Sequence, residues 1–267
     1  MRQAIATGNQ AFELLLTLQL AEPASRLLIR GFDPERDWSV YFDRRAGTPT
    51  RPLPAGPVTL AFPLPISPTI LDVVATARGL ENQEVAVRLE HCGSKELPTR
   101  PLLTQEQDQQ WLSFAIYLAL NLPYLEPTRD ERYPYQSEEG FLYRVLRLIR
   151  NRETGVLLNT PARINRRTGV LEVSVEQMLH YTIPMRVVVL LHEYIHVRDQ
   201  TDDEQACDEG ALRLFTAAGF PLSEGLYAFS KVFDKRPELM ARVHRAAQQL
   251  LDYDQVFRLP SAAGTVA

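Results

Sequence analysis

Residues 184–200, "PMRVVVLLHEYIHVRDQ", join an apolar run to two histidines, and they decide how the C-terminal half of the chain is interpreted. The stretch predicts a helix, because Pro184 is tolerated in a first helical turn. On a helix His192 and His196 lie one turn apart on one face, so both can reach a single metal ion. The apolar run "VVVLL" would anchor the helix in the core and give the histidines rigid support.

Glu193 follows the first histidine and is rotated from it by about 100° around a helix. It can therefore sit beside an ion without binding it, and it can accept a proton from a metal-bound water. This is the mechanical basis of the His-Glu-x-x-His motif. The competing interpretation is that His192 and His196 are packed or surface residues of an ordinary amphipathic helix.

An acidic cluster, "TDDEQACDEGAL" (201–212), follows the motif. A catalytic zinc ion needs three protein ligands and one open position. Glu204 and Asp208 share one face of the next predicted helix, 203–219, which runs back against the first helix if the chain turns at 199–202. Glu204 is then the favoured third ligand, and Asp208 would accept a hydrogen bond from a ligand histidine. Asp202 is the alternative third ligand, and enrichment of carboxylates at a helix N-terminus is a further explanation of the cluster.

The pair "HEYIH" and "EQACD" resembles the gluzincin branch of the zincin metallopeptidases, with Cys207 in the place usually taken by alanine. Residues 159–196 and "GALRLFTAAGFP" (210–221) are also similar to a bacterial and phage-associated group of zincin-like proteins. The gap from His196 to Glu204 is much shorter than in the best-known gluzincins, which requires either a very tight turn or another third ligand. Asp202 stands where metzincin-type proteases keep theirs.

The resemblance implies one zinc ion per chain, held by His192, His196 and Glu204, with Glu193 as general base and Asp208 orienting a histidine. It implies hydrolysis of a peptide or protein substrate. In such enzymes a strand beside the active-site helix pairs with the extended substrate. We expect "VLEVSV" (170–175) to be this strand, with the substrate-edge residues Leu171, Glu172, Val173 and Ser174. Three residues remain alternatives for stabilising the oxyanion: Tyr181, Tyr227 and His244.

The sequence predicts an α+β fold with two parts. Alternating apolar residues at 12–20, 38–42 and 84–90 indicate an antiparallel β-sandwich-like domain. The proline-dense segment 48–70 favours edges and extended connections there. The expected boundaries are a β-rich domain (1–92), a linker (93–103), a zincin-like domain (104–255) and a C-terminal tail (256–267).

The second part is expected to begin with a helix at 104–120, with Thr104 as N-cap. Strands at 141–150, 156–164 and 170–175 would form a three-stranded meander, because two turn signals ending in glycine separate them. Helices at 184–200, 203–219, 223–233 and 236–253 would complete the domain. Gly219 is a suitable stop for the second of these helices.

The 267-residue chain has a net charge of −4 and only two cysteines, which indicate neither a nucleic-acid partner nor a disulfide framework. No segment resembles a signal peptide or a membrane helix, so no membrane partner and a cytoplasmic location are expected. The alternative function is a non-catalytic zincin-like module in a phage or phage-derived assembly. In that case the N-terminal β-domain contacts an assembly partner and the protein is virion- or particle-associated.

Overall fold

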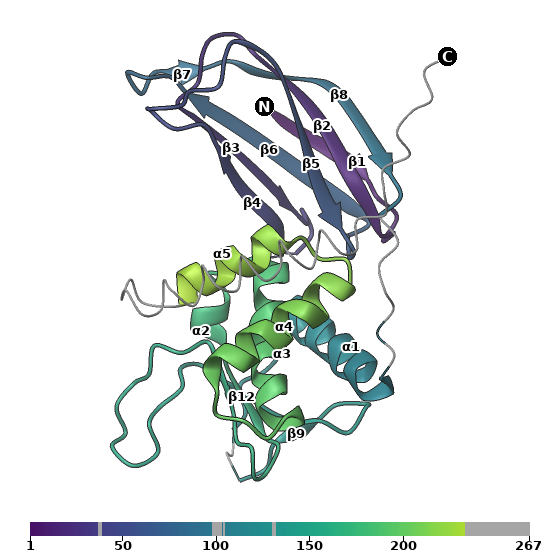
Figure 1. The fold of residues 1–267 in the computed structure, drawn as a ribbon, viewed down its shortest axis with the longest axis vertical. Helices are drawn as coiled ribbons and strands as arrows, with labels where there is room; N and C mark the ends of the chain where they lie inside the picture. Colours follow the sequence, from purple (N-terminus) through teal and green to yellow (C-terminus); the bar gives the residue numbers. More distant parts are fainter. Residues whose placement is uncertain (37–38, 98–102, 104, 130–131, 233–267) are drawn as a thin grey trace.

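A computed structural model describes residues 1–36, 39–97, 103, 105–129 and 132–232, which form an α+β fold. Strands from the N-terminal part gather at one end of the molecule, and helices with a small sheet form the other end (Figure 1). Buried apolar side chains from both ends belong to one contact cluster. The predicted fold class is therefore confirmed.

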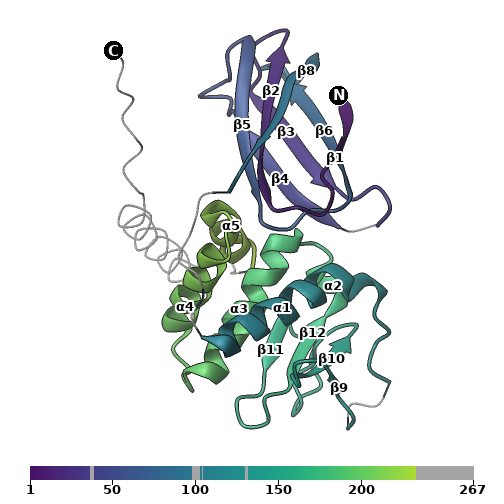
Figure 2. The ribbon, with the colours of Figure 1, turned by 90° about the vertical axis from the view of Figure 1, so that its right-hand side faces the viewer.

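The N-terminal strands form two antiparallel sheets packed as a sandwich (Figure 2). The larger sheet has the order β1-β6-β3-β4, with β7 paired to β6, and the smaller sheet has the order β5-β2-β8. Every second residue of β2 is buried, because alternate side chains of a strand point to opposite faces. The strands are β1 (Arg2–Ala6), β2 (Phe12–Leu20), β3 (Arg26–Phe32), β4 (Val40–Ala46), β5 (Gly56–Leu64), β6 (Ile70–Arg78), β7 (Glu84–Val85) and β8 (Val87–Lys95).

The proline-dense segment contributes an edge strand. β5 contains Pro57 and Pro63 and pairs only with β2. Proline has no backbone N–H and cannot donate a hydrogen bond to a neighbouring strand. It is therefore tolerated in an edge strand, where one side of the backbone is unpaired. β8 continues to Lys95 and so occupies the first residues of the stretch predicted as a linker. Residues 98–102 and 104 lie outside the described part, and so does the predicted N-cap Thr104.

Helix α1 (Glu106–Asn121) begins the second part, with Gln105 in the N-cap position. Its buried face includes Trp111, whose Nε1 donates to the carbonyl of Leu190 at 3.2 Å. A short 3-10 helix, η1 (Leu122–Tyr124), ends it. This contact packs α1 directly against the helix that carries the histidines.

The small sheet has the order β11-β12-β10-β9, formed by β9 (Tyr135–Gln136), β10 (Leu142–Leu146), β11 (Ala162–Ile164) and β12 (Leu171–Ser174). β12 lies between β10 and β11, and it is parallel to β10. The predicted meander, with the second strand in the middle, is therefore wrong. A bridge between Arg150 and Leu157 folds the intervening segment onto itself, so the chain returns to the sheet at its edge.

Four helices follow: α2 (Val175–Met178), α3 (Ile183–Arg198), α4 (Glu204–Ala217) and α5 (Leu222–Val232). Thr182 caps α3 by accepting from the backbone N–H of Met185, and every residue from Ile183 to His192 is buried. Gly219 follows α4 with a φ of 89°, which favours glycine and ends the helix as predicted. The predicted helix 236–253 and the tail 256–267 lie outside the described residues.

Helices α3 and α4 pack closely because Gly210 of α4 faces Ile195 of α3. A Cβ atom at Gly210 would lie 3.0 Å from the Ile195 side chain. The connection between the helices is tight, with Gln200 in the left-handed region at a φ of 51°. This geometry brings the N-terminal turns of α4 alongside the C-terminal half of α3. Within the described ranges, no helix combines the length and apolar character needed to cross a membrane.

Candidate metal centre

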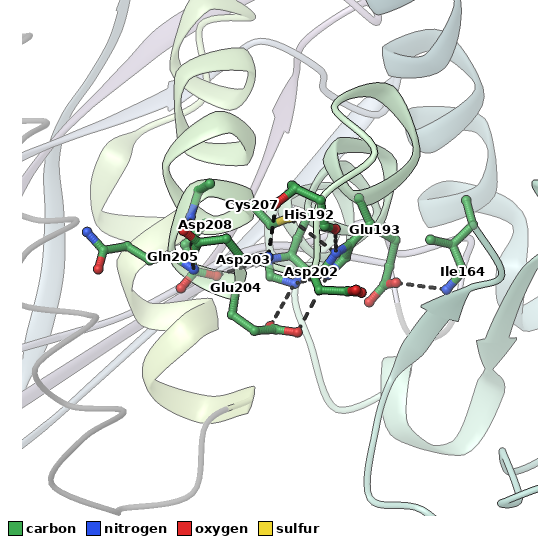
Figure 3. Close-up of polar contacts among 12 residues, drawn as sticks. Ile164, His192, Glu193, Asp202, Asp203, Glu204, Gln205, Cys207 and Asp208 are labelled. Carbon is green, nitrogen blue, oxygen red and sulfur yellow. Dashed lines mark hydrogen bonds and ion pairs between the residues drawn. The ribbon is translucent and has the colours of Figure 1, made fainter. Parts of the chain in front are cut away.

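His192 and His196 point the same edge of their imidazole rings toward a common point beside α3. Their Nε2 atoms lie 3.2 Å apart. Glu204 reaches this point from the first turn of α4, as Figure 3 shows. Its Oε2 is 3.4 Å from Nε2 of His192, and its Oε1 is 3.7 Å from Nε2 of His196. Among the described residues, these three form a group that could hold a metal ion.

The spacing of the three groups fits a tetrahedral ion. Two ligand atoms that each lie about 2.05 Å from zinc, at the tetrahedral angle, are about 3.3 Å apart. The observed separations of 3.2, 3.4 and 3.7 Å are close to this value. Three protein donors also leave a fourth tetrahedral position open, which distinguishes catalytic from structural zinc sites.

The other ring nitrogen of each histidine is held by an acceptor. Nδ1 of His192 lies 2.9 Å from Oδ1 of Asp208, and Nδ1 of His196 lies 2.8 Å from the carbonyl oxygen of Thr201. An acceptor at Nδ1 places the proton there in a neutral imidazole, so each Nε2 presents a lone pair to the common point. A cation or a proton between these atoms would offset the repulsion between the lone pairs and the carboxylate.

The surroundings of His192 favour positive charge. Burial opposes the charged imidazolium, but hydrogen bonds to Asp208 and Glu204 outweigh burial and raise the pKa of His192 to about 10. The same negative surroundings stabilise any cation placed at the Nε2 atoms. Asp208 is 2% exposed and lies on α4 one turn after Glu204, so one helix supplies both carboxylates.

Asp202, the alternative third ligand, lines the same cavity but binds another partner. Its side chain is 78% exposed and forms an ion pair with Arg166, which follows β11. Asp202 is not part of the group that could hold an ion within the described residues. The tight turn between α3 and α4 brings Glu204, rather than Asp202, to the histidines.

Glu193 points from α3 toward the small sheet, away from Glu204 (Figure 3). Its Oε2 accepts a hydrogen bond of 2.8 Å from the backbone N–H of Ile164 in β11. Burial raises the pKa of the Glu193 carboxyl. A raised pKa suits a group that must accept a proton and return it near neutral pH.

The strand beside the cleft is β11, and the prediction that residues 170–175 form it is wrong. β12 is paired on both sides, and Leu171, Glu172, Val173 and Ser174 are all buried. The error arose because the predicted meander put the third strand at an edge. Glu172 instead forms ion pairs with Arg144, Arg152 and Arg163 on the sheet.

The outer edge of β11 faces the candidate centre. The carbonyl of Pro161 and the N–H of Asn165 bond to β12, and the register pairs Arg163 with Glu172. In an antiparallel ladder the backbone groups of alternate residues point to opposite sides. The backbone groups of Ala162 and Ile164 therefore face away from β12, toward α3.

A cavity of about 320 Å³ lies between β11 and the three candidate ligands. Its walls include Val189 of α3 and Phe229 of α5, and the ring of Phe229 lies 6.2 Å from that of His192. Arg166 and Asp202 line its mouth. No local sequence pattern marks Phe229 or the carbonyl of Thr201 as part of the site.

Two of the three alternatives for an oxyanion donor are not brought to this cavity. Neither Tyr181 nor Tyr227 is among its lining residues, and His244 lies outside the described part of the chain. Cys207 is buried, with its Sγ 3.3 Å from Nδ1 of His196. Burial raises the pKa of the Cys207 thiol to about 12, so it packs between α3 and α4 as a neutral group.

Together, the fold and the site define an α+β protein in which an i, i+4 histidine pair and a carboxylate from the next helix form a candidate metal centre. No protein-family model matches the chain, and no curated protein matches it. The function is therefore argued from the geometry of the site.

Proposed function

We propose that the protein is a zinc-dependent metallopeptidase of the zincin type, in which His192, His196 and Glu204 hold the ion. One observation carries the proposal: both Nε2 atoms and the Glu204 carboxylate converge at separations of 3.2 to 3.7 Å, while acceptors fix both Nδ1 atoms. The donor set of two imidazoles and one carboxylate is one that catalytic zinc sites use.

Zinc in such a site acts as a Lewis acid that polarises a carbonyl and lowers the pKa of a coordinated water. Glu193 accepts a proton from the attacking water and later donates it to the leaving amine of the cleaved peptide bond. Its hydrogen bond to Ile164 aims the carboxylate along the cleft, between the ligands and β11. Asp208 and the Thr201 carbonyl keep the two histidines in the orientation that the site requires.

The outer edge of β11 favours a peptide as the substrate, although Glu193 already accepts from the Ile164 N–H and the Thr160 hydroxyl already donates to the Ala162 carbonyl. An extended chain can add to a sheet edge through backbone hydrogen bonds, which do not depend on side-chain identity. Such a chain would run between β11 and α3, past Glu193 and the three ligands. Val189 and Phe229 would supply apolar contacts to one of its side chains.

The first experiment measures the metal content of the purified full-length protein by mass spectrometry, for wild type, Glu204→Ala and Asp202→Ala. We expect about one zinc ion per chain in wild type and in Asp202→Ala, and loss of zinc in Glu204→Ala. Wild-type protein that takes up no zinc, even after incubation with the ion, would overturn the proposal.

A second variant separates metal binding from catalysis. Glu193→Gln keeps the size of the side chain but removes its ability to accept a proton. We expect this variant to retain zinc and to lose cleavage of a mixed peptide library, measured by mass spectrometry of the products. If wild type binds zinc but cleaves no peptide, the alternative of a non-catalytic module in a larger assembly becomes the better explanation.

A further inference from the structure

The wall of the cavity opposite α4 is made by a segment with a strong positive charge. Residues 141–170 contain seven arginines and a single acidic residue, Glu153, whereas the whole chain has a net charge of −4. All thirty residues of this segment are described, and they carry β10, the excursion after it, and β11. Two of the seven arginines, Arg163 and Arg166, line the cavity itself.

Neighbouring carboxylates neutralise only part of this charge. Buried Glu172 accepts ion pairs from three guanidinium groups, of Arg144, Arg152 and Arg163, which leaves this cluster with excess positive charge. The Arg cluster holds the pKa of Glu172 below its usual range despite burial. Arg152 remains 53% exposed and Arg163 30% exposed, so the excess charge is accessible from solvent.

Arg166 brings this charge to the mouth of the cavity. It lies two residues after Ile164, whose N–H donates to Glu193. Its side chain lines the cavity and is 36% exposed. Arg166 belongs to the turn after β11, where the N–H groups of Thr168 and Gly169 bond back to the carbonyl of Asn165, so it stands just past the end of the strand. Asp202 orients the guanidinium across the mouth, but an arginine has five N–H donors, and some remain for a second carboxylate.

We propose that Arg166 is a specificity-determining residue, and that the cleft selects peptides with an acidic side chain close to the cleaved bond. The inference rests on the proposed function, since it places an extended peptide along β11. The substrate carboxylate binds the free donors of Arg166, while Arg163 and its neighbours attract acidic peptides to this side of the cleft.

The opposite rim favours a peptide over a nucleic acid. Asp202 and Glu204 line the α4 side of the cleft. A continuous phosphate backbone would meet these carboxylates, whereas a peptide can present a single acidic side chain to Arg166 and neutral groups to the other rim. The charge pattern is one-sided, which matches a ligand with localised negative charge.

Binding to the zinc-loaded Glu193→Gln protein tests the inference without requiring turnover. The probes are short fluorescent peptides with uncharged mixed residues and one Glu, Gln or Lys at each position in turn, and the readout is fluorescence anisotropy. We expect Glu to bind about tenfold more tightly than Lys at one position, as one charge-assisted hydrogen bond allows. Adding Arg166→Gln should abolish the preference, and adding Arg166→Glu should reverse it.

Arg167 supplies the matched control, because it is the exposed neighbour of Arg166 and does not line the cavity. Adding Arg167→Gln should leave the preference within about twofold, as expected for a screened surface charge. Zinc content shows that each variant retains the folded site. The inference would be overturned if the Arg166 and Arg167 variants lose the preference for Glu equally. It would also be overturned if no peptide position shows a preference.

Three further outcomes have distinct meanings. Displacement of the Glu peptide by a short oligothymidylate as effectively as by unlabelled peptide would reveal a general polyanion surface and overturn the inference. Wild-type cleavage of these peptides without any charge preference overturns the inference but supports the proposed function. Charge-selective binding that depends on Arg166, with no cleavage by wild type, supports the selective site and counts against the peptidase.

Discussion

Arg44 of β4 lies 3.3 Å from the carboxylate of Glu224 in α5, whose side chain is only 1% exposed. The same carboxylate accepts a hydrogen bond of 3.1 Å from Oγ1 of Thr182, the residue that caps α3. One buried acid therefore links the sandwich, the helix that contributes Phe229 to the cavity, and the start of the helix that carries the histidines. This linkage gives the N-terminal sheets a structural role in positioning the site.

Replacing Arg44 with alanine should destabilise the protein. The change leaves the buried Glu224 carboxylate without this cation, which we expect to lower the free energy of unfolding by about 2 kcal/mol, less than for a fully buried pair because Arg44 is 27% exposed. Arg45→Ala, an exposed neighbour on the same strand, should change it by less than about 0.5 kcal/mol. Urea unfolding followed by circular dichroism measures both, and equal effects would show that the contact contributes nothing specific.

Asp208 should tune zinc affinity without binding the ion. Asp208→Asn weakens the acceptor at Nδ1 of His192, so we expect the zinc dissociation constant to rise by about 10- to 100-fold. Glu209 also lies on α4, and among the described contacts its carboxylate accepts only from Gln205. Glu209→Gln therefore serves as the control. Competition with a chromophoric zinc chelator gives both constants, and an unchanged value for Asp208→Asn would mean that the histidine needs no such support.

The grouping of His192, His196 and Glu204 could be predicted because helical periodicity is a local property of the sequence. A spacing of four residues places side chains on one face whatever the rest of the fold does. The sequence predicts Glu204 as the third ligand only if the chain turns tightly at 199–202. That turn depends on a left-handed Gln200 and on the close packing that Gly210 permits against Ile195.

The strand order could not be predicted in the same way. β11 has three residues, too short for a periodic signal, and β12 has the stronger strand pattern but lies inside the sheet. The position of a strand depends on contacts between distant segments, which composition and spacing do not encode. The Thr201 carbonyl could not be predicted either, because every residue type has one. Arg166 could not be distinguished from the adjacent Arg167 by sequence.

Glu172 should make the stability of the small sheet sensitive to acid. Its pKa in the folded protein is depressed by Arg152 and Arg163 although burial acts in the opposite direction. A depressed folded pKa contributes stability that is present above the unfolded value of about 4.3 and is lost as the pH falls through the folded value. Glu172→Gln should therefore lower stability at neutral pH and flatten the fall in thermal midpoint below about pH 4. A parallel shift at every pH would show that its charge is not involved.

Removing the ion with a chelator should destabilise the wild-type protein. The effect should depend on the three ligand residues. A ligand that binds only the folded state at a thousand times its dissociation constant adds about 4 kcal/mol to the free energy of unfolding. Without it, the Nε2 atoms and the Glu204 carboxylate again face one another at 3.2 to 3.7 Å. We therefore expect a chelator to lower the thermal midpoint of wild type and of Asp202→Ala by several degrees, and to leave Glu204→Ala nearly unchanged. Calorimetry with and without added zinc measures this difference, and an equal response of all three proteins would place the stabilising ion outside this site.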